Sequence, residues 1–288
     1  MRLTINVVTR NRCHLLKQAV DSILKTKKLP TTKVMISADD DDPDTIEIAR
    51  QLAPDVVLSV KPREDTLCEK MNRCLTAAPG DVYLFASDYG LFQNHGFDEH
   101  ICDSAALFPD GIGVVNGPLA NLSFSGVQCV TAKFAEFNGG VWPGYFPYWF
   151  GDHWIDDVAR MIRRLVYAPA IVDTHKLRPG YTHRLRDVDF WATFFDATYI
   201  LRHRIAEKMF DAMDDPQWRK DAQRRTFELT RQRSQILNTM VRNGKDHIHQ
   251  SRGSGDKDDP HYDRAKARAE KLLLAIYDEL VVKEGKAA

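Results

Sequence analysis

The sequence predicts an α/β fold in which helices cover both faces of a mostly parallel sheet. Two observations lead to this fold class. Short apolar runs that suit buried strands alternate with segments in which apolar residues recur at helical spacing. Polar loops follow several of the predicted strands, as is typical of such sheets, whose ligands bind outside the carboxyl ends of the strands.

The first strand and helix are the clearest elements. Leu3, Ile5 and Val7 alternate with polar residues, which predicts a strand, and the polar loop 9–12 follows it. The next segment carries apolar residues at helical spacing, namely Leu15, Leu16, Ala19, Val20, Ile23 and Leu24. Two lysines and Pro30 end this predicted helix.

The same rhythm continues to the fourth strand. The expected elements are a strand at Val34–Ile36, an acidic loop at Asp39–Asp42, a helix from Asp44 through Leu52, a strand at Val56–Val60, a helix marked by Leu67, Met71 and Leu75, and a strand at Val82–Ala86. Asp44 is expected to cap its helix. The ends of the strands place the loops 9–12, 39–42 and 87–89 at one edge of the sheet.

The later part of the chain is more mixed. The expected elements are a helix capped by Asp98 and running through Leu107, a strand at Ile112–Asn116, a loop rich in glycine and aromatic residues at 137–150, and a helix at 152–164. Charged helical segments begin near Tyr199, and a break at 252–260 precedes a last helix at 262–282. We therefore predict a main domain at 1–198 and a helical C-terminal extension at 199–288.

The composition excludes several classes of protein. The 288 residues include 40 basic and 40 acidic side chains, so global charge favours neither nucleic acid nor an anionic membrane. No apolar stretch is long enough to span a bilayer, and the N-terminus reads as a strand rather than a secretory signal. Five cysteines without Cys-x-x-Cys spacing argue against a zinc site or a disulfide framework, and they fit a cytoplasmic protein.

Several motifs in order resemble the family 2 glycosyltransferases with the GT-A fold. They are Thr9-Arg10-Asn11-Arg12 with its following helix, the acidic loop after strand two, the segment Pro79 to Asp88, and Gly96-Phe97-Asp98-Glu99. The resemblance covers roughly residues 1 to 195 and leaves the C-terminal third unexplained. It implies a Rossmann-like GT-A domain, and an enzyme that moves a sugar from a nucleotide-diphosphate sugar to an acceptor hydroxyl.

The resemblance also implies a divalent metal ion, Mn²⁺ or Mg²⁺, that neutralises the leaving diphosphate. The family holds this ion with an Asp-x-Asp motif, but the matching stretch here is Ala86-Ser87-Asp88, so Asp88 is the one carboxylate retained. The competing interpretation is that Asp88 only caps a turn. A late histidine is often a further ligand in such enzymes. His175 occupies about the right place and His183 is the alternative, although a lone histidine is more often structural.

The donor nucleotide is expected against the first two loops. In the resembling enzymes the loop after strand two holds the base, and a carboxylate of Asp39 or Asp40 can accept the uracil N3–H, which favours a UDP-sugar. A solvated acidic loop is the competing interpretation. The remaining candidates for contacts with the donor are Thr9, Arg10, Arg12 and Ser87. Arg12 could equally be a surface charge beside a helix.

The general base is expected at the start of the helix at 152–164. In inverting transferases of the resembling type, an Asp or Glu there removes the proton of the acceptor hydroxyl. Asp152 is the first candidate and Asp156 the second, because residues four apart share a helix face. Helix capping by Asp152 is the competing interpretation. The aromatic residues before Asp152 suit either stacking on a ligand or an ordinary core, and their glycines suggest a mobile loop.

Other functions remain open at this stage. A nucleotidyltransferase shares the sheet but would want a Gly-rich phosphate loop after strand one, and residues 9–14 contain no glycine. A non-catalytic, transferase-like binding module is compatible with the reduced Asp-x-Asp motif. The acceptor is expected to be a carbohydrate or a small molecule. Nucleic-acid bases are the alternative, because arginines recur between Arg202 and Arg242. The sequence identifies neither the sugar, the acceptor nor the oligomeric state.

Overall fold

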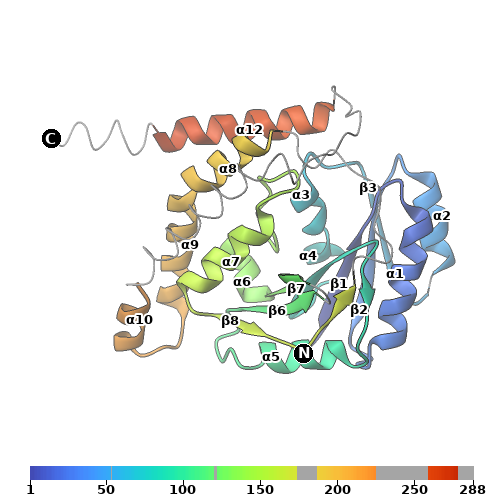
Figure 1. The fold of residues 1–288 in the computed structure, drawn as a ribbon, viewed down its shortest axis with the longest axis horizontal. Coiled ribbons are helices and arrows are strands. Elements are labelled where there is room, and N and C mark those ends of the chain that lie inside the picture. The colour runs from blue at the N-terminus through green and yellow to red at the C-terminus, as the bar shows by residue number, and fades with distance from the viewer. Residues whose placement is uncertain (53, 120–121, 174–186, 225–258, 278–288) are drawn as a thin grey trace.

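A single large sheet organises the chain in the computed structural model, which describes residues 1–52, 54–119, 122–173, 187–224 and 259–277 (Figure 1). The strands are β1 Leu3–Val8, β2 Lys33–Asp39, β3 Val57–Lys61, β4 Val82–Ser87, β5 Leu91–Phe92, β6 Val114–Leu119, β7 Leu122–Thr131, β8 Leu165–Tyr167 and β9 Val172–Asp173. The helices are α1 Cys13–Thr26, α2 Pro43–Gln51, α3 Leu67–Met71, α4 Cys74–Ala77, α5 Phe97–Ala105, α6 Ala132–Asn138, α7 Gly151–Met161, α8 Val188–Ala197, α9 Tyr199–Ala212, α10 Gln217–Arg224 and α12 Pro260–Tyr277.

The sheet is mostly parallel, as the sequence predicts. Within the described residues its order is β3-β2-β1-β4-β7-β6-β9-β5, and β8 pairs with β6. The strands β3, β2, β1 and β4 are parallel, whereas β7 runs antiparallel to both β4 and β6. The central strand β1 is hydrogen-bonded to β2 and β4, so the loops that follow these three strands leave the sheet side by side.

Helices cover both faces of the sheet because alternate residues of each strand point to opposite sides. In β1, Leu3, Ile5 and Val7 join a buried cluster with α1 and α5, whereas Val8 joins the cluster on the other face. Figure 1 shows α1 and α2 on one side of the sheet and α6, α7 and α9 on the other. Each face therefore has its own hydrophobic core.

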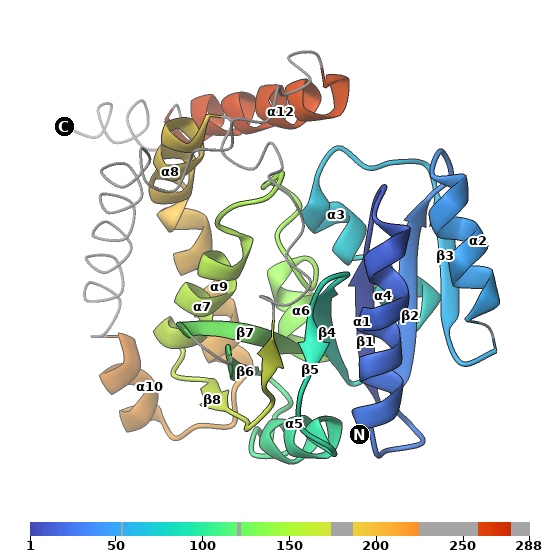
Figure 2. The same cartoon turned by 45° about the vertical axis from the view of Figure 1, so that its right-hand side comes forward.

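The helical C-terminal part packs onto the same molecule. Trp191 of α8, Met209 and Phe210 of α9, and Tyr262 of α12 all belong to the buried cluster that contains α7. Figure 2 shows α12 lying beside α8 at the edge of the molecule. The predicted boundary between residues 198 and 199 thus falls between two helices that share one core, and the division into two domains stays a prediction.

Two predicted helix caps are wrong. Asp42, not Asp44, caps α2, because its carboxylate accepts hydrogen bonds from the backbone N–H and the hydroxyl of Thr45. Gly96, in a left-handed conformation, precedes α5, and the buried Asp98 in the first turn of this helix reaches across to the segment after α1. Its carboxylate accepts from the backbone N–H groups of Lys28 and Leu29. At α2, Pro43 at the first helical position marks Asp42 as the cap, whereas at α5 a tertiary contact engages Asp98.

The helix predicted over Leu67 to Leu75 is split into α3 and α4. Thr66 and Glu69 form a reciprocal capping box at the start of α3. Among the described helices, none has both the length and the apolar character that a membrane span requires.

Candidate functional site

The three loops predicted to converge do meet at the carboxyl ends of β1, β2 and β4. Val8 is the register partner of both Ser37 in β2 and Ser87 in β4. The Arg12 Nε atom lies 2.9 Å from Asp88 Oδ2, which joins the first loop to the third. Lys70 Nζ lies 2.7 Å from the backbone oxygen of Thr9 and 2.8 Å from Asp39 Oδ1, which joins the first loop to the second.

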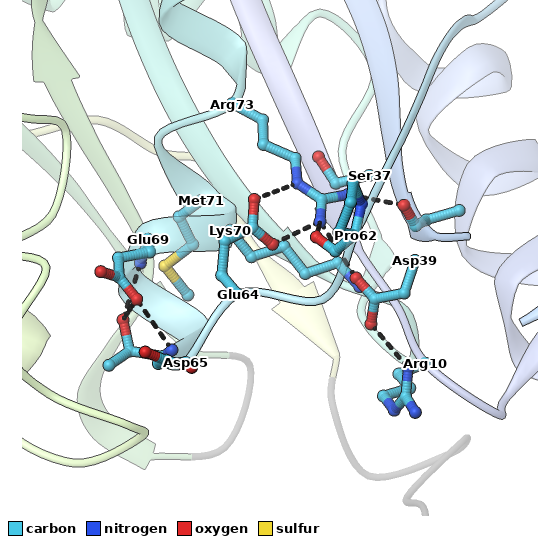
Figure 3. Close-up of polar contacts among 12 residues, drawn as sticks. Arg10, Ser37, Asp39, Pro62, Glu64, Asp65, Glu69, Lys70, Met71 and Arg73 are labelled. Atoms are coloured by element: carbon cyan, nitrogen blue, oxygen red, sulfur yellow. Dashed lines mark hydrogen bonds and ion pairs between the residues drawn. The ribbon is translucent and has the colours of Figure 1, made fainter. Parts of the chain in front are cut away.

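Asp39 is the centre of a buried ionic network (Figure 3). Its side chain is 1% exposed, and Oδ2 accepts a hydrogen bond of 3.0 Å from Arg10 Nη1. Its Oδ1 is contacted by Lys70 Nζ and by Arg73 Nη2, the latter at 3.1 Å. Three cations therefore hold the carboxylate that the sequence assigns to the base of the donor.

Lys70 and Arg73 come from α3 and the turn after it. Arg73 also donates to the backbone oxygens of Ala38 and Pro62 and forms an ion pair with Glu64. Burial lowers the pKa of Lys70, although the carboxylate of Asp39 opposes this shift. The network thus fixes α3 against the end of β2.

The outer part of the acidic loop is more exposed. Asp41 forms a two-pronged contact with Arg10, at 2.5 Å and 2.8 Å. Hydrogen bonding from Arg10 lowers the pKa of Asp41 to about 2. The side chain of Asp40 is exposed. Arg10 therefore holds the acidic loop in place, and Asp40 is the carboxylate of the pair Asp39 and Asp40 that faces solvent.

Asp88 is fully buried directly after β4. Within the described part of the chain, neither of its carboxylate oxygens receives a well-directed hydrogen bond, although Arg12 forms an ion pair with it. Burial raises the pKa of Asp88, and the charge of Arg12 and the hydroxyl of Thr9 only partly offset this rise. Ser87, the last residue of β4, is half-buried next to it.

The two candidate bases on α7 lie in different surroundings. The side chain of Asp152 is 56% exposed, and its Oδ1 lies 2.9 Å from Nδ1 of His153. Asp156 instead accepts a hydrogen bond from Asn116 Nδ2 at 2.9 Å and pairs with Arg160. The contacts of Asp156 connect α7 to β6, whereas the exposed Asp152 carboxylate is accessible to a ligand.

The charge state of Asp152 follows from its neighbour. The surrounding protein disfavours the ionised form, but the charge and the hydrogen bonds of His153 outweigh this and lower the pKa of Asp152. Burial raises the pKa of Cys68 in α3, and the negative charge of Asp152 raises it further. The start of α7 lies against α3, the helix that also carries Lys70, because a Cβ added to Gly151 would lie 3.0 Å from Cys68 Sγ.

The aromatic segment before Asp152 is largely core. Trp142, Phe146 and Phe150 are at most 6% exposed, whereas Tyr145 is 39% exposed. The segment is tethered to the α3 region, because Asn72 exchanges two hydrogen bonds with the backbone of Trp142. The mobile loop was predicted from glycine content and stays a prediction. Amino-acid composition does not reveal the two hydrogen bonds that tether this segment.

Residues 4–88 match the family model described as glycosyl transferase family 2. This match contains the loops of Arg12, Asp39 and Asp88, and it supports the predicted resemblance. The chain has a GT-A-like fold, and its N-terminal part, residues 4–88, matches the family 2 glycosyltransferases. No curated protein matches the sequence significantly.

Solved structures show the same fold for almost the whole chain. TarS from S. aureus, in complex with UDP-GlcNAc, aligns with a TM-score of 0.57 and 12% identity, over 95% of this chain and 82% of that one. The mannosyltransferase PcManGT from Pyrobaculum calidifontis, in complex with GDP-Man and Mn²⁺, aligns with a TM-score of 0.50 and 14% identity, over 97% and 87%. At these identities the likeness concerns the fold.

The described residues alone supply too few ligands for a divalent cation, so the phosphate oxygens of a donor would have to supply others. No group of three or more His, Cys, Asp or Glu side chains that could hold a metal ion occurs in the described part of the chain. Asp88 nevertheless offers a buried carboxylate without well-directed hydrogen bonds, which is a suitable oxygen ligand for Mg²⁺ or Mn²⁺. Such ions commonly use one or two carboxylates together with phosphate oxygens and water. The predicted ligand His175 and its alternative His183 lie outside the described residues.

Sequence reasoning missed the cations of α3 and the histidine beside Asp152. Lys70 lies in α3 and Arg73 lies three residues further on, in the turn after this helix. This spacing, next to a strand end rich in aspartate, was a signal for an ionic network. His153 carried no such signal, because its contact with Asp152 depends on local side-chain geometry.

Proposed function

We propose that the transferase moves a sugar from a nucleotide-diphosphate sugar, with a UDP-sugar favoured, to an acceptor hydroxyl by an inverting displacement. One observation carries this proposal: the loops of Arg12, Asp39 and Asp88 meet at the carboxyl ends of β1, β2 and β4. This is the edge at which sheets of this kind bind their ligands. The neighbouring TarS structures contain UDP or UDP-GlcNAc, which supports the same donor class here.

Asp152 is the proposed general base. Its exposed carboxylate is kept ionised by His153, so it can accept the proton of the acceptor hydroxyl while that oxygen attacks the anomeric carbon. Asp156, the second candidate, is occupied by Asn116 and Arg160. The transferase therefore has one exposed carboxylate at the start of α7 for this role.

The donor would lie over the first three loops. Asp88 would hold a divalent cation, Mn²⁺ or Mg²⁺, and a bound cation neutralises the charge that develops on the leaving diphosphate. Thr9, Arg12 and Ser87 border the same place. Asp40 is the better candidate for the uracil N3–H, because three cations already hold Asp39.

A carbohydrate or small-molecule acceptor is favoured over nucleic acid. The argument for nucleic acid rested on arginines in the C-terminal third, and Arg202, one of the described ones, has a structural role. It is completely buried against Phe195. Contacts with nucleic-acid phosphates need exposed cations.

A cytoplasmic location is part of the same proposal. All five cysteines are free thiols, and four of them are buried. Free thiols are typical of proteins in a reducing compartment.

The proposal is tested by release of the nucleotide from a panel of nucleotide sugars, with and without Mn²⁺. We expect UDP-sugars to be hydrolysed slowly and only with the metal ion. Asp88→Asn should lose this activity. Asp152→Asn should lose about 10²- to 10⁴-fold in rate, the typical effect of a general base, while UDP still binds.

The matched control is Asp103→Asn, which removes an exposed carboxylate from α5. It should leave both rate and binding unchanged. If the wild-type protein binds nucleotide sugars but hydrolyses none of them with any acceptor, the chain is a transferase-like binding module. If Asp88→Asn is as fast as the wild type, the metal assignment is wrong.

A further inference from the structure

We propose that Arg12 neutralises Asp88 in the donor-free transferase and moves to the donor diphosphate when a divalent cation binds Asp88. Metal ion and nucleotide would then bind as a coupled pair. This inference rests on the proposed function, and it assigns to Arg12 a role in positioning and binding.

The first observation is that Asp88 depends on Arg12. A buried carboxylate needs a positive partner, because transfer of an unpaired charge from water into the protein interior is strongly unfavourable. Asp88 is 0% exposed, and Arg12 Nε at 2.9 Å is its ion-pair partner among the described residues. Lys70 contributes charge only from further away, since its ammonium group contacts the Thr9 backbone oxygen and Asp39.

The second observation is the missing carboxylate two residues before Asp88. Ala86 stands where the family motif has its first aspartate, so β4 ends with one acidic side chain. Arg12 balances that single charge. The pair of Arg12 and Asp88 therefore has no net negative charge to attract a divalent cation, and the positive charge of Arg12 repels such a cation. We expect the metal ion alone to bind weakly.

The third observation is that Arg12 is placed to change partners. Its side chain is 26% exposed, and Nε, its atom nearest to Asp88, donates no well-directed hydrogen bond to the carboxylate. The guanidinium carbon lies 5.8 Å from the ring centroid of Tyr89, the residue after Asp88. A guanidinium fork matches the geometry of phosphate oxygens, so a diphosphate gives Arg12 a new partner when a metal ion takes over Asp88.

These observations imply reciprocal coupling between the two ligands. If UDP raises the affinity for Mn²⁺ by some factor, Mn²⁺ must raise the affinity for UDP by the same factor. For two ligands that exchange the partners of one ion pair, we expect coupling on the order of tenfold or more.

The test is Mn²⁺ binding by calorimetry and by electron paramagnetic resonance, with and without saturating UDP, so that no catalytic activity is needed. The wild type should bind Mn²⁺ weakly alone and more tightly with UDP. Arg12→Gln leaves Asp88 without its counter-ion. It should bind Mn²⁺ alone on the order of tenfold more tightly than the wild type and lose most of the coupling.

Two further variants keep the result interpretable. Arg10→Gln removes the same charge from the same loop, but Arg10 contacts Asp39 and Asp41 rather than Asp88, so metal binding without UDP should change much less. Arg12→Lys retains the charge without the fork. It should keep the weak binding of Mn²⁺ alone and reduce the coupling, and it replaces Arg12→Gln if that variant does not fold.

The outcomes separate this inference from the proposed function. If Arg12→Gln binds Mn²⁺ no more tightly than the wild type and its coupling to UDP is unchanged, the exchange of partners is refuted while the metal site stands. If neither the wild type nor Asp88→Asn binds Mn²⁺ even with UDP, the metal-dependent function itself fails. If Arg12→Lys retains the full coupling, the guanidinium fork has no part in it.

Discussion

Replacing Asp39 by asparagine should strongly destabilise the protein, because it removes the one carboxylate that three cations share. The side chain of Lys70 is 8% exposed and that of Arg73 is 2% exposed. Arg73 keeps Glu64 as an ionic partner, but Lys70 keeps only the backbone oxygen of Thr9. Removing one partner of a buried ion pair costs about 3–5 kcal/mol, and an asparagine oxygen still accepts one hydrogen bond. We therefore expect a loss of about 3 kcal/mol.

Urea denaturation at neutral pH measures this loss, and Asp41→Asn is the matched control. Asp41 also pairs with Arg10, but its side chain is 55% exposed, so its replacement should cost at most about 1 kcal/mol. The deficit of Asp39→Asn should shrink as pH rises. An unpaired buried Lys70 has a depressed pKa in the folded state, and its loss of a proton favours folding. Equal stabilities of the two variants would refute the structural role of Asp39.

Three further outcomes test the start of α7 and the residues around it. Gly151→Ala should destabilise the fold by about 1–3 kcal/mol in thermal or urea unfolding, since its Cβ would lie 2.5 Å from Cε3 of Trp142, and a neutral effect would contradict the packing described. His153→Gln should lower stability by less than about 1 kcal/mol, and only at acidic pH. Burial opposes the charged form of His153, but the charge of Asp152 outweighs this and raises the pKa of His153. The contribution of His153 to stability is therefore complete below about pH 6, and it disappears as pH rises through the pKa of His153 in the folded protein. If the stability difference between His153→Gln and the wild type grew as pH rises, this explanation would be wrong. The same variant should also shift the acidic limb of the pH–rate profile to higher pH, because His153 keeps Asp152 ionised.

Much of the fold follows from local pattern. Alternation in Leu3, Ile5 and Val7 and helical spacing from Leu15 to Leu24 were sufficient for β1 and α1, because burial of one face imposes these periods on any sequence. The parallel order of strands made the meeting of three loops predictable. The caps were predicted less well. Pro43 marks the preceding Asp42 as the cap of α2, a local signal that was missed, whereas the contact of Asp98 with the segment after α1 depends on the tertiary structure.

The candidate site was predictable in position but not in the state of its side chains. Asp39 and Asp88 lie at the carboxyl ends of β2 and β4, and Asp152 lies in the first turn of α7, while their roles stay predictions. Only the tertiary structure shows that Asp39 is held by three cations, that Asp88 is paired with Arg12, and that Asp152 remains exposed. Hydrogen-bond partners come from segments far apart in the chain, and periodicity contains no information about them.

In the C-terminal third, too, the sequence predicts the elements but not their contacts. The sequence predicted charged helices there, and its described part contains α9, α10 and α12. The sequence did not predict that α12 returns to the segment before α3. Asp65 contacts His261 and Arg264, and Glu69 contacts Arg268, across about 200 residues of chain. Local spacing determines which elements form, because each helix or strand buries its own apolar face. The choice of ionic partners depends on how those elements pack, so it is decided only in the folded molecule.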